Sequence, residues 1–66
     1  MGTVNRVRVV REKRGLSRRD LARVTGLGER SIAYIEDGVK SPRVENAVKI
    51  ARALDVSIAD LFQYVA

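Results

Sequence analysis

The chain has 66 residues and a net charge of +5, and it contains neither cysteine nor histidine. Its length allows one small domain, residues 1–66, and the missing residue types exclude disulfides, thiolate zinc sites and the commonest metal ligand. Nine of the thirteen basic residues, but only three of the eight acids, lie in residues 1–30. This asymmetry favours a polyanionic partner for one face, although a solvated, arginine-rich surface explains it equally well.

No apolar run approaches the roughly 18 residues that a membrane span needs, and no secretory signal precedes the domain. We therefore expect a cytoplasmic protein without a membrane partner. Because so short a chain builds only a small core, we expect packed helices, helped by dimerisation, to supply its stability.

Residues 4–10 carry an apolar stripe at helical spacing. Its members are Val4, Val7 and Val10. The stripe ends before Gly15, a residue type suited to the position that follows a helix. Val9 lies off the stripe, and a run of β-branched residues forms helices poorly. We expect a helix here, with a strand as the alternative, although no other segment reads as a partner for that strand.

The next helix is expected to begin after Ser17. The run Ser17–Asp20 has the S-x-x-D form of a capping box, in which the serine and the acid each bond to the other's backbone N–H. Gly26 ends this helix, and a third one follows at about residues 28–37 and ends at Gly38. The residues expected inward are Leu21, Ala22 and Thr25 in the first of these helices and Ser31, Ile32 and Ile35 in the second.

Ser41 and Pro42 can start a fourth helix, because proline lacks only an N–H that the first turn does not use. Its expected inward residues are Val44, Ala47, Val48, Ala51 and Leu54. The run Ser57–Asp60 repeats the capping-box form and opens a final helix. That helix is expected to carry Leu61, Phe62 and Val65. The prediction is an all-α domain of five short helices.

Two short amphipathic helices joined by a glycine-containing turn are typical of a helix-turn-helix. The residues around the pair make the pattern more specific. They read LSRRDLA at 16–22, GL at 26–27, SIAYIEDG at 31–38, proline at 42, IARALDVS at 50–57 and LF at 61–62. This string resembles the phage repressor and Cro family, also called the XRE family, over about residues 6–62 and without a gap.

The resemblance implies a five-helix, phage-repressor-like fold in which the second and third helices form the DNA-binding unit and the third reads the major groove. It implies a transcriptional regulator, expected to be a repressor, that binds double-stranded DNA at a pseudo-palindromic operator as a homodimer, in the cytoplasm and with the nucleoid. No cofactor, metal or catalytic residue is expected. The alternative is a protein-interaction module of the same fold, such as an antitoxin or a corepressor. The acidic Glu29 and Asp37 count toward that alternative.

Four outward residues of the third helix are candidate base contacts. They are Glu29, Arg30, Ala33 and Tyr34. Arginine can bond guanine through O6 and N7, glutamate can accept from cytosine N4, and an alanine methyl can touch thymine. Glu29 can instead favour the helix dipole, and Tyr34 can instead contact a phosphate or cover the edge of the core.

The resemblance also implies phosphate contacts and one structural ion pair. The candidate phosphate contacts are Ser17, Arg18, Lys40 and Arg43, and Arg18 stands where the family commonly has glutamine. The ion pair joins Arg11 to Glu36 and orients the third helix. Two residues depart from the family, Gly28 at a cap that is usually serine or threonine and Asp55 at a frequent glycine.

The dimer surface is less clearly marked in the sequence. The first choice is the C-terminal segment, with the residues Leu61, Phe62, Tyr64 and Val65. These apolar side chains can instead close the core of the monomer.

Overall fold

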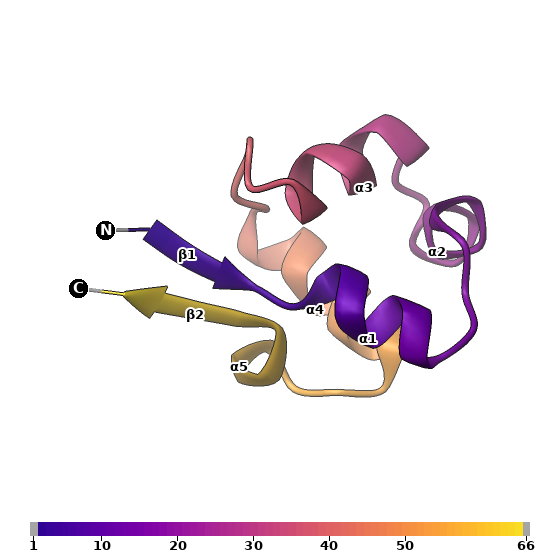
Figure 1. The fold of residues 1–66 in the computed structure, drawn as a ribbon. Coiled ribbons are helices and arrows are strands. Elements are labelled where there is room, and N and C mark those ends of the chain that lie inside the picture. The colour runs from indigo at the N-terminus through magenta and orange to yellow at the C-terminus, as the bar shows by residue number, and fades with distance from the viewer. Residues whose placement is uncertain (1, 66) are drawn as a thin grey trace.

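The computed structural model describes the backbone of residues 2–65 and the side chains of residues 5–62. Its helices confirm the predicted five-helix fold. They are α1 (Val7–Lys13), α2 (Arg18–Thr25), α3 (Glu29–Glu36), α4 (Val44–Leu54) and α5 (Ile58–Leu61). Two short strands, β1 (Gly2–Asn5) and β2 (Phe62–Val65), extend from this helical body (Figure 1).

Local sequence signals determine where α2 begins and ends. The Ser17 hydroxyl accepts a hydrogen bond from the Asp20 N–H at 3.0 Å, and the Asp20 carboxylate accepts one from the Ser17 N–H at 3.0 Å. The helix ends at Gly26, whose φ of +77° is a left-handed conformation that glycine adopts without a steric penalty. Ser57 and Asp60 form the same capping box at α5. Both predicted boxes are therefore confirmed.

The start of α4 differs from the prediction. Its N-cap is Arg43, no side chain caps it, and the helix begins at Val44, so Ser41 and Pro42 lie in the preceding loop. The buried face of α4 also differs from the expected one: Ile50, which was not among the expected inward residues, is fully buried, whereas Val44 is 78% exposed. In α3, Ser31 is exposed and not inward as expected. Asp55, which stands where the family frequently has glycine, ends α4 in a left-handed conformation with a φ of 56°.

The strands β1 and β2 form a two-stranded antiparallel ribbon, with Gly2 opposite Val65 and Asn5 opposite Phe62. The ribbon leaves the helical body at one end, so the first and last described residues lie side by side (Figure 1). The final helix therefore ends at Leu61 and does not reach Val65 as predicted. The stripe on α1 begins at Val7, because Val4 belongs to β1.

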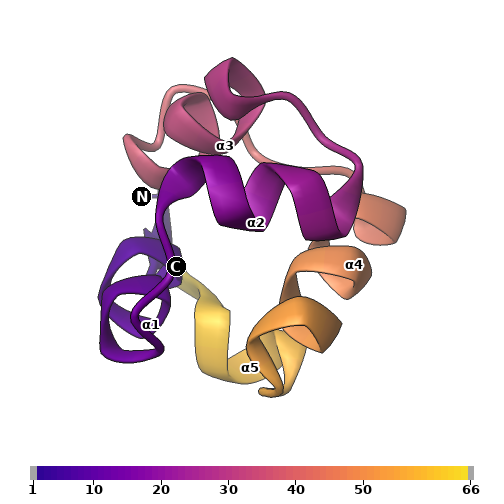
Figure 2. The same ribbon diagram turned by 90° about the vertical axis from the view of Figure 1, so that its right-hand side faces the viewer.

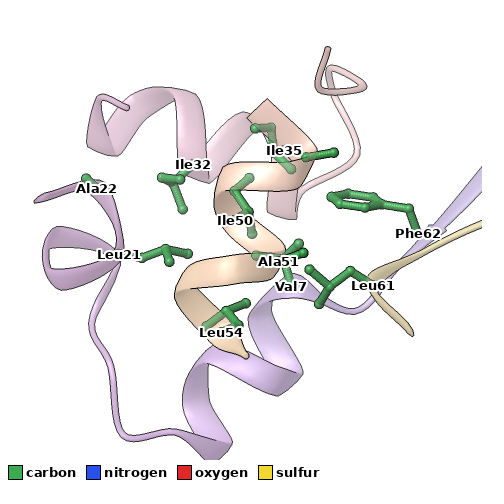
Figure 3. Packing of buried hydrophobic residues seen from close by; sticks show 11 residues of the cluster. Val7, Leu21, Ala22, Ile32, Ile35, Ile50, Ala51, Leu54, Leu61 and Phe62 are labelled. Carbon is green, nitrogen blue, oxygen red and sulfur yellow. The ribbon is translucent and has the colours of Figure 1, made fainter. Parts of the chain in front are cut away.

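The helices enclose one hydrophobic core. In Figure 2, α3 lies above α2, α1 and α4 lie on opposite sides, and α5 lies below. Six residues have almost no exposed area, and they come from five different helices. They are Val7, Leu21, Ile32, Ile50, Leu54 and Leu61. Figure 3 shows Ile50, Ala51 and Leu54 of α4 pointing into the middle of this cluster. This packing holds α3 on the surface with one face free.

Candidate nucleic-acid interface

Helix α3 has one buried and one exposed face. Ile32 and Ile35 face the core at 0% and 5% exposure and anchor the helix. The four candidate base contacts lie on the other sides of the helix. Glu29, Arg30 and Tyr34 are exposed, and Ala33 is half-buried. The helix begins at Gly28, whose extended backbone caps it without a side-chain hydrogen bond.

A shallow hollow of about 350 Å³ lies between α3 and the start of α4. Its lining residues are Arg30, Ser31, Tyr34, Ile35, Lys40, Ser41, Pro42, Arg43 and Asn46. They include three cations and no carboxylate. Two candidate base contacts, Arg30 and Tyr34, therefore share this hollow with two candidate phosphate contacts, Lys40 and Arg43.

The loop after α3 folds back onto the helix. The N–H of Val39 donates to the carbonyl of Tyr34 at 2.9 Å, and Gly38 makes the turn with a φ of +75°. This turn places the Lys40 ammonium 5.4 Å from the centre of the Tyr34 ring. A cation at this distance is attracted by the negative face of an aromatic ring. The contact holds Tyr34 and Lys40 together at one side of the exposed face of α3.

The buried end of α3 is surrounded by arginines. The Glu36 side chain has no exposed area, and it accepts hydrogen bonds from Arg11 Nε at 2.6 Å, Arg11 Nη2 at 3.2 Å and Arg18 Nε at 3.0 Å. Arg11 also donates to the Leu16 carbonyl at 2.8 Å. The structure thus brings Arg11 and Glu36 into contact, and it adds Arg18, one of the candidate phosphate contacts, to the same carboxylate.

A fourth and a fifth residue extend this group. Arg8 Nη2 lies 2.6 Å from Asp37 Oδ1, and Arg8 Nε lies 3.4 Å from Glu36 Oε1. We call the five side chains the arginine–carboxylate cluster. Its members are Arg8, Arg11, Arg18, Glu36 and Asp37. Sequence reasoning did not pair Arg8 with Asp37. The available signal was that Arg8 and Arg11 stand three residues apart on one face of a helix.

The pKa of the Glu36 carboxyl reflects two opposing effects. Burial by itself would raise this pKa, but the hydrogen bonds from Arg11 and Arg18 outweigh burial and lower the pKa below its ordinary value. The pKa of Asp20 is also lowered, chiefly by the hydrogen bond from the Ser17 N–H. The carboxylates of Glu36 and Asp20 are therefore charged at neutral pH. The arginine–carboxylate cluster itself combines three guanidinium groups with two carboxylates.

The start of α1 is tied to the end of α3. The Asn5 side chain accepts from the Val7 N–H at 2.8 Å, and its amide group donates to the carbonyl of Ile35. One side chain at the end of β1 thus supports the first turn of α1 and occupies a carbonyl in the last turn of α3. The position of α3 therefore depends on both the arginine–carboxylate cluster and the terminal ribbon.

The remaining candidate phosphate contacts lie at the start of α2. Ser17 is exposed, and its hydroxyl oxygen already accepts the capping bond from Asp20, so its O–H remains a donor. Arg18 is 38% exposed.

Among the described residues, no group of three or more carboxylates could hold a metal ion, and no helix is long and apolar enough to cross a membrane.

The helix-turn-helix family model HTH_3 matches residues 7–61. The chain belongs to the helix-turn-helix family. This membership confirms the resemblance to the phage repressor and Cro proteins.

Two archaeal relatives are HTH-type transcriptional regulators, both described as uncharacterized. One, from Archaeoglobus fulgidus, is 37% identical over 86% of the chain and 81% of the relative. The other, from Methanocaldococcus jannaschii, is 35% identical over 91% of each. The crystal structure of the restriction-modification controller protein C.AhdI from Aeromonas hydrophila superimposes with a TM-score of 0.82 at 35% identity, covering 86% of both chains.

Proposed function

We propose that this helix-turn-helix protein binds double-stranded DNA sequence-specifically and regulates transcription, with α3 in the major groove. The observation that carries the proposal is the cationic hollow beside the exposed face of α3, where Arg30, Lys40 and Arg43 meet without a carboxylate. A basic surface of this kind attracts the phosphate backbone. The relatives that are named as transcriptional regulators support the same function.

Base reading is assigned to the exposed residues of α3. Arg30 would bond guanine through O6 and N7, Glu29 would accept from cytosine N4, and the Ala33 methyl would touch thymine. Tyr34, whose ring lies under the Lys40 ammonium, would contact a base or a phosphate. Arg30 carries most of the expected specificity, because a bidentate contact to guanine discriminates each base pair by about 1–3 kcal/mol.

Phosphate contacts are assigned to two places that flank α3. Ser17 and Arg18 at the start of α2 would bind one phosphate, and Lys40 and Arg43 before α4 would bind another. The Arg11–Glu36 pair would orient α3 from behind without touching DNA. The Asp37 carboxylate would repel DNA phosphates less than the sequence suggested, because Arg8 Nη2 lies 2.6 Å from it and offsets its charge.

The protein is proposed to act as a homodimer on a pseudo-palindromic operator. An eight-residue helix is only about 12 Å long, so one α3 reads a few base pairs and a second copy must supply the rest of the specificity. Of the expected dimer surface, Leu61 and Phe62 are buried inside the monomer at 0% and 7% exposure, because they close the core. The side chains of Tyr64 and Val65 lie outside the described residues.

A different apolar surface is better placed for the dimer contact. Val44 is 78% exposed and Ile58 is 38% exposed. With Pro42, Ala47 and Phe62 they line a small hollow beside the start of α4. A two-fold contact brings the same patch of both copies together, so an apolar patch complements itself. Pro42 also lines the hollow next to α3, so a dimer joined here would present both α3 helices near one another.

The regulator is proposed to be a repressor that acts in the cytoplasm with the nucleoid, since a protein occupying an operator excludes others from that DNA. Selection from a random pool of duplex DNA tests the proposal. We expect enrichment of a pseudo-palindrome whose half-sites are about 34–36 Å apart, one turn of DNA. Binding to duplex DNA should also weaken steeply with salt. Failure to enrich any sequence, together with a flat salt response, would reject DNA binding and favour a protein-interaction module.

A further inference from the structure

The most unusual feature of the cluster is that one buried carboxylate binds guanidinium groups from two different helices. Arg11 of α1 donates to Glu36 from both Nε and Nη2, and Arg18 of α2 donates to Glu36 Oε1 from Nε. A single ion pair would be enough to anchor the end of α3. The second one instead fixes the orientation of a side chain that is 38% exposed.

The rest of the Arg18 guanidinium is left for another ligand. Within the described part of the chain, neither of its terminal amino groups donates a hydrogen bond, and Nη2 lies 4.0 Å from Asp37 Oδ1, beyond hydrogen-bonding distance. The planar guanidinium carries five N–H donors in a rigid fork, so one edge can bind Glu36 while the other binds a phosphate. Lysine offers no such fixed second edge.

Asp37 would oppose a phosphate at this place, because its carboxylate is 48% exposed and lies next to Arg18. Arg8 compensates this charge, with Nη2 2.6 Å from Asp37 Oδ1. The three guanidinium groups of the cluster therefore exceed its two carboxylates by one charge. Arg8 and Arg18, at 45% and 38% exposure, are the two cations of the cluster that reach solvent.

We infer that Glu36 is a positioning residue for a phosphate clamp: it holds Arg18 through Nε so that its terminal amino groups bind a DNA phosphate, while Arg8 neutralises Asp37 beside it. The inference rests on the proposed DNA binding and deepens it. The buried pair and the clamp form one unit, so neither Glu36 nor Arg8 needs to touch DNA in order to change its affinity.

The first test measures binding of a fluorescein-labelled duplex of random sequence by anisotropy over a series of salt concentrations. Arg18→Gln should lower the magnitude of the negative slope of log K against log salt by about 0.9, the contribution of one phosphate contact. Glu36→Gln should lower it equally, and the double variant should lose no more than either single one. Arg52→Gln, which removes the same charge from an exposed residue of α4, should leave the slope unchanged.

An unchanged slope in Arg18→Gln, or additive losses in the double variant, would overturn the inference. If the unmodified protein does not bind the duplex at all, the proposed function itself fails, so the two failures are distinguishable.

Because Glu36→Gln removes a buried charge and could unfold the protein, a second pair of variants uses exposed residues. Arg8→Gln should weaken binding of the same duplex several-fold, since it leaves Asp37 uncompensated beside Arg18. Asp37→Asn in that background should restore the affinity. If Asp37→Asn restores nothing, Arg8 contacts the phosphate itself and the assigned role of Arg8 is wrong. Circular dichroism checks that each variant is folded. If Arg8 had a purely structural role, Arg8→Gln would lower the melting temperature and Asp37→Asn would not restore DNA affinity.

Discussion

At the scale of single residues, Glu36 combines complete burial with a full charge. Taking a carboxylate out of water costs several kcal/mol, and the hydrogen bonds from Arg11 and Arg18 offset that cost. Removing Glu36 therefore has a larger effect than the net stabilisation by the group, because it leaves a buried guanidinium without its carboxylate. Arg11 is 7% exposed, so it would be the charge most affected.

Glu36→Ala is expected to destabilise the fold by about 3–5 kcal/mol, the usual cost of breaking a buried ion pair. In a chain of this length the melting temperature should fall by more than about 10 °C. Thermal unfolding followed by circular dichroism measures the change. Glu12→Ala, at an exposed residue of α1, is the matched control and should stay within about 0.5 kcal/mol of the parent. An unchanged melting curve for Glu36→Ala would contradict the buried pair.

The lowered pKa of Glu36 makes stability depend on acid. Since its folded-state pKa lies below the ordinary value of 4.5, the stabilisation is fully present above that value and is lost as the pH falls toward the folded-state pKa. Urea unfolding between about pH 6 and pH 3 should show a decreasing free energy of unfolding. Glu36→Gln should flatten this dependence but not abolish it, because Asp20 also has a lowered pKa. Equal pH dependence in both proteins would refute the assignment.

Arg30→Ala is expected to relax base preference at one position of each half-site. The lost contact to guanine should reduce discrimination there by about 1–3 kcal/mol. Competition binding with operators that carry single base changes measures the preference. If the variant binds all sequences more weakly by the same factor, Arg30 is a phosphate contact and specificity lies elsewhere on α3.

The residue contacts were only partly accessible from the sequence. The family resemblance pointed to Arg11 and Glu36 together, although they lie 25 residues apart. It said nothing of Arg8 and Asp37, because that ion pair depends on how closely α1 approaches the end of α3. Likewise, the sequence placed Arg18 at a phosphate contact but gave no sign that Glu36 holds it, since this bond joins two helices across the core surface.

At the scale of elements, the helix starts are determined by short-range chemistry. Both capping boxes could be predicted from the sequence, because the serine and the aspartate stand three residues apart and bond to each other within the same turn. The start of α4 was misplaced because Ser41 and Pro42 imitate a cap-and-first-turn pair while the helix begins two residues after Pro42. Separately, Val44 was expected inward and Ile50 was not, although Ala47, Ile50, Ala51 and Leu54 share one helical face.

The α2 cap permits a test that separates stability from DNA binding. Ser17→Ala should destabilise the protein by about 1 kcal/mol through loss of the cap, whereas Ser17→Asp retains a capping oxygen and should restore most of it. The aspartate also adds a negative charge at the proposed phosphate contact, so it should bind duplex DNA more weakly than the parent. Urea unfolding and anisotropy titration measure the two effects. Unchanged DNA affinity in Ser17→Asp would remove Ser17 from the phosphate contacts.

The two-stranded ribbon of β1 and β2 was not predicted from the sequence. The sequence offers a strand as the alternative for residues 4–10 but no partner for it. The reason is that β2 directly follows a capped helix, and its first residue, Phe62, continues the apolar pattern of Leu61 at the end of α5. Phe62 is buried at the point where the chain leaves α5 and becomes extended. The pairing joins segments from the two ends of the chain, so a short stretch of sequence cannot predict it.

At the scale of the whole molecule, the proposed dimer is the feature most open to measurement. Val44→Glu should shift the protein from dimer to monomer in sedimentation experiments, because it buries a charge in the apolar patch, and operator affinity should fall with it. The fold should remain intact, since Val44 is 78% exposed. Val24→Glu is the matched control, at another valine that is 65% exposed on α2. A monomeric parent protein, or a dimer unaffected by Val44→Glu, would place the interface elsewhere.

The pairing of β1 with β2 also bears on the order in which the chain folds. The contacts between α2 and α3 join neighbours in the sequence, whereas the ribbon joins its opposite ends, and closing so long a loop is entropically slow. We expect the helices to pack together first and the two strands of the ribbon to pair last. Asn5 can reach the Ile35 carbonyl only at that late step. In hydrogen exchange, the ribbon amides should therefore open more readily than those of the buried turns of α2 and α4.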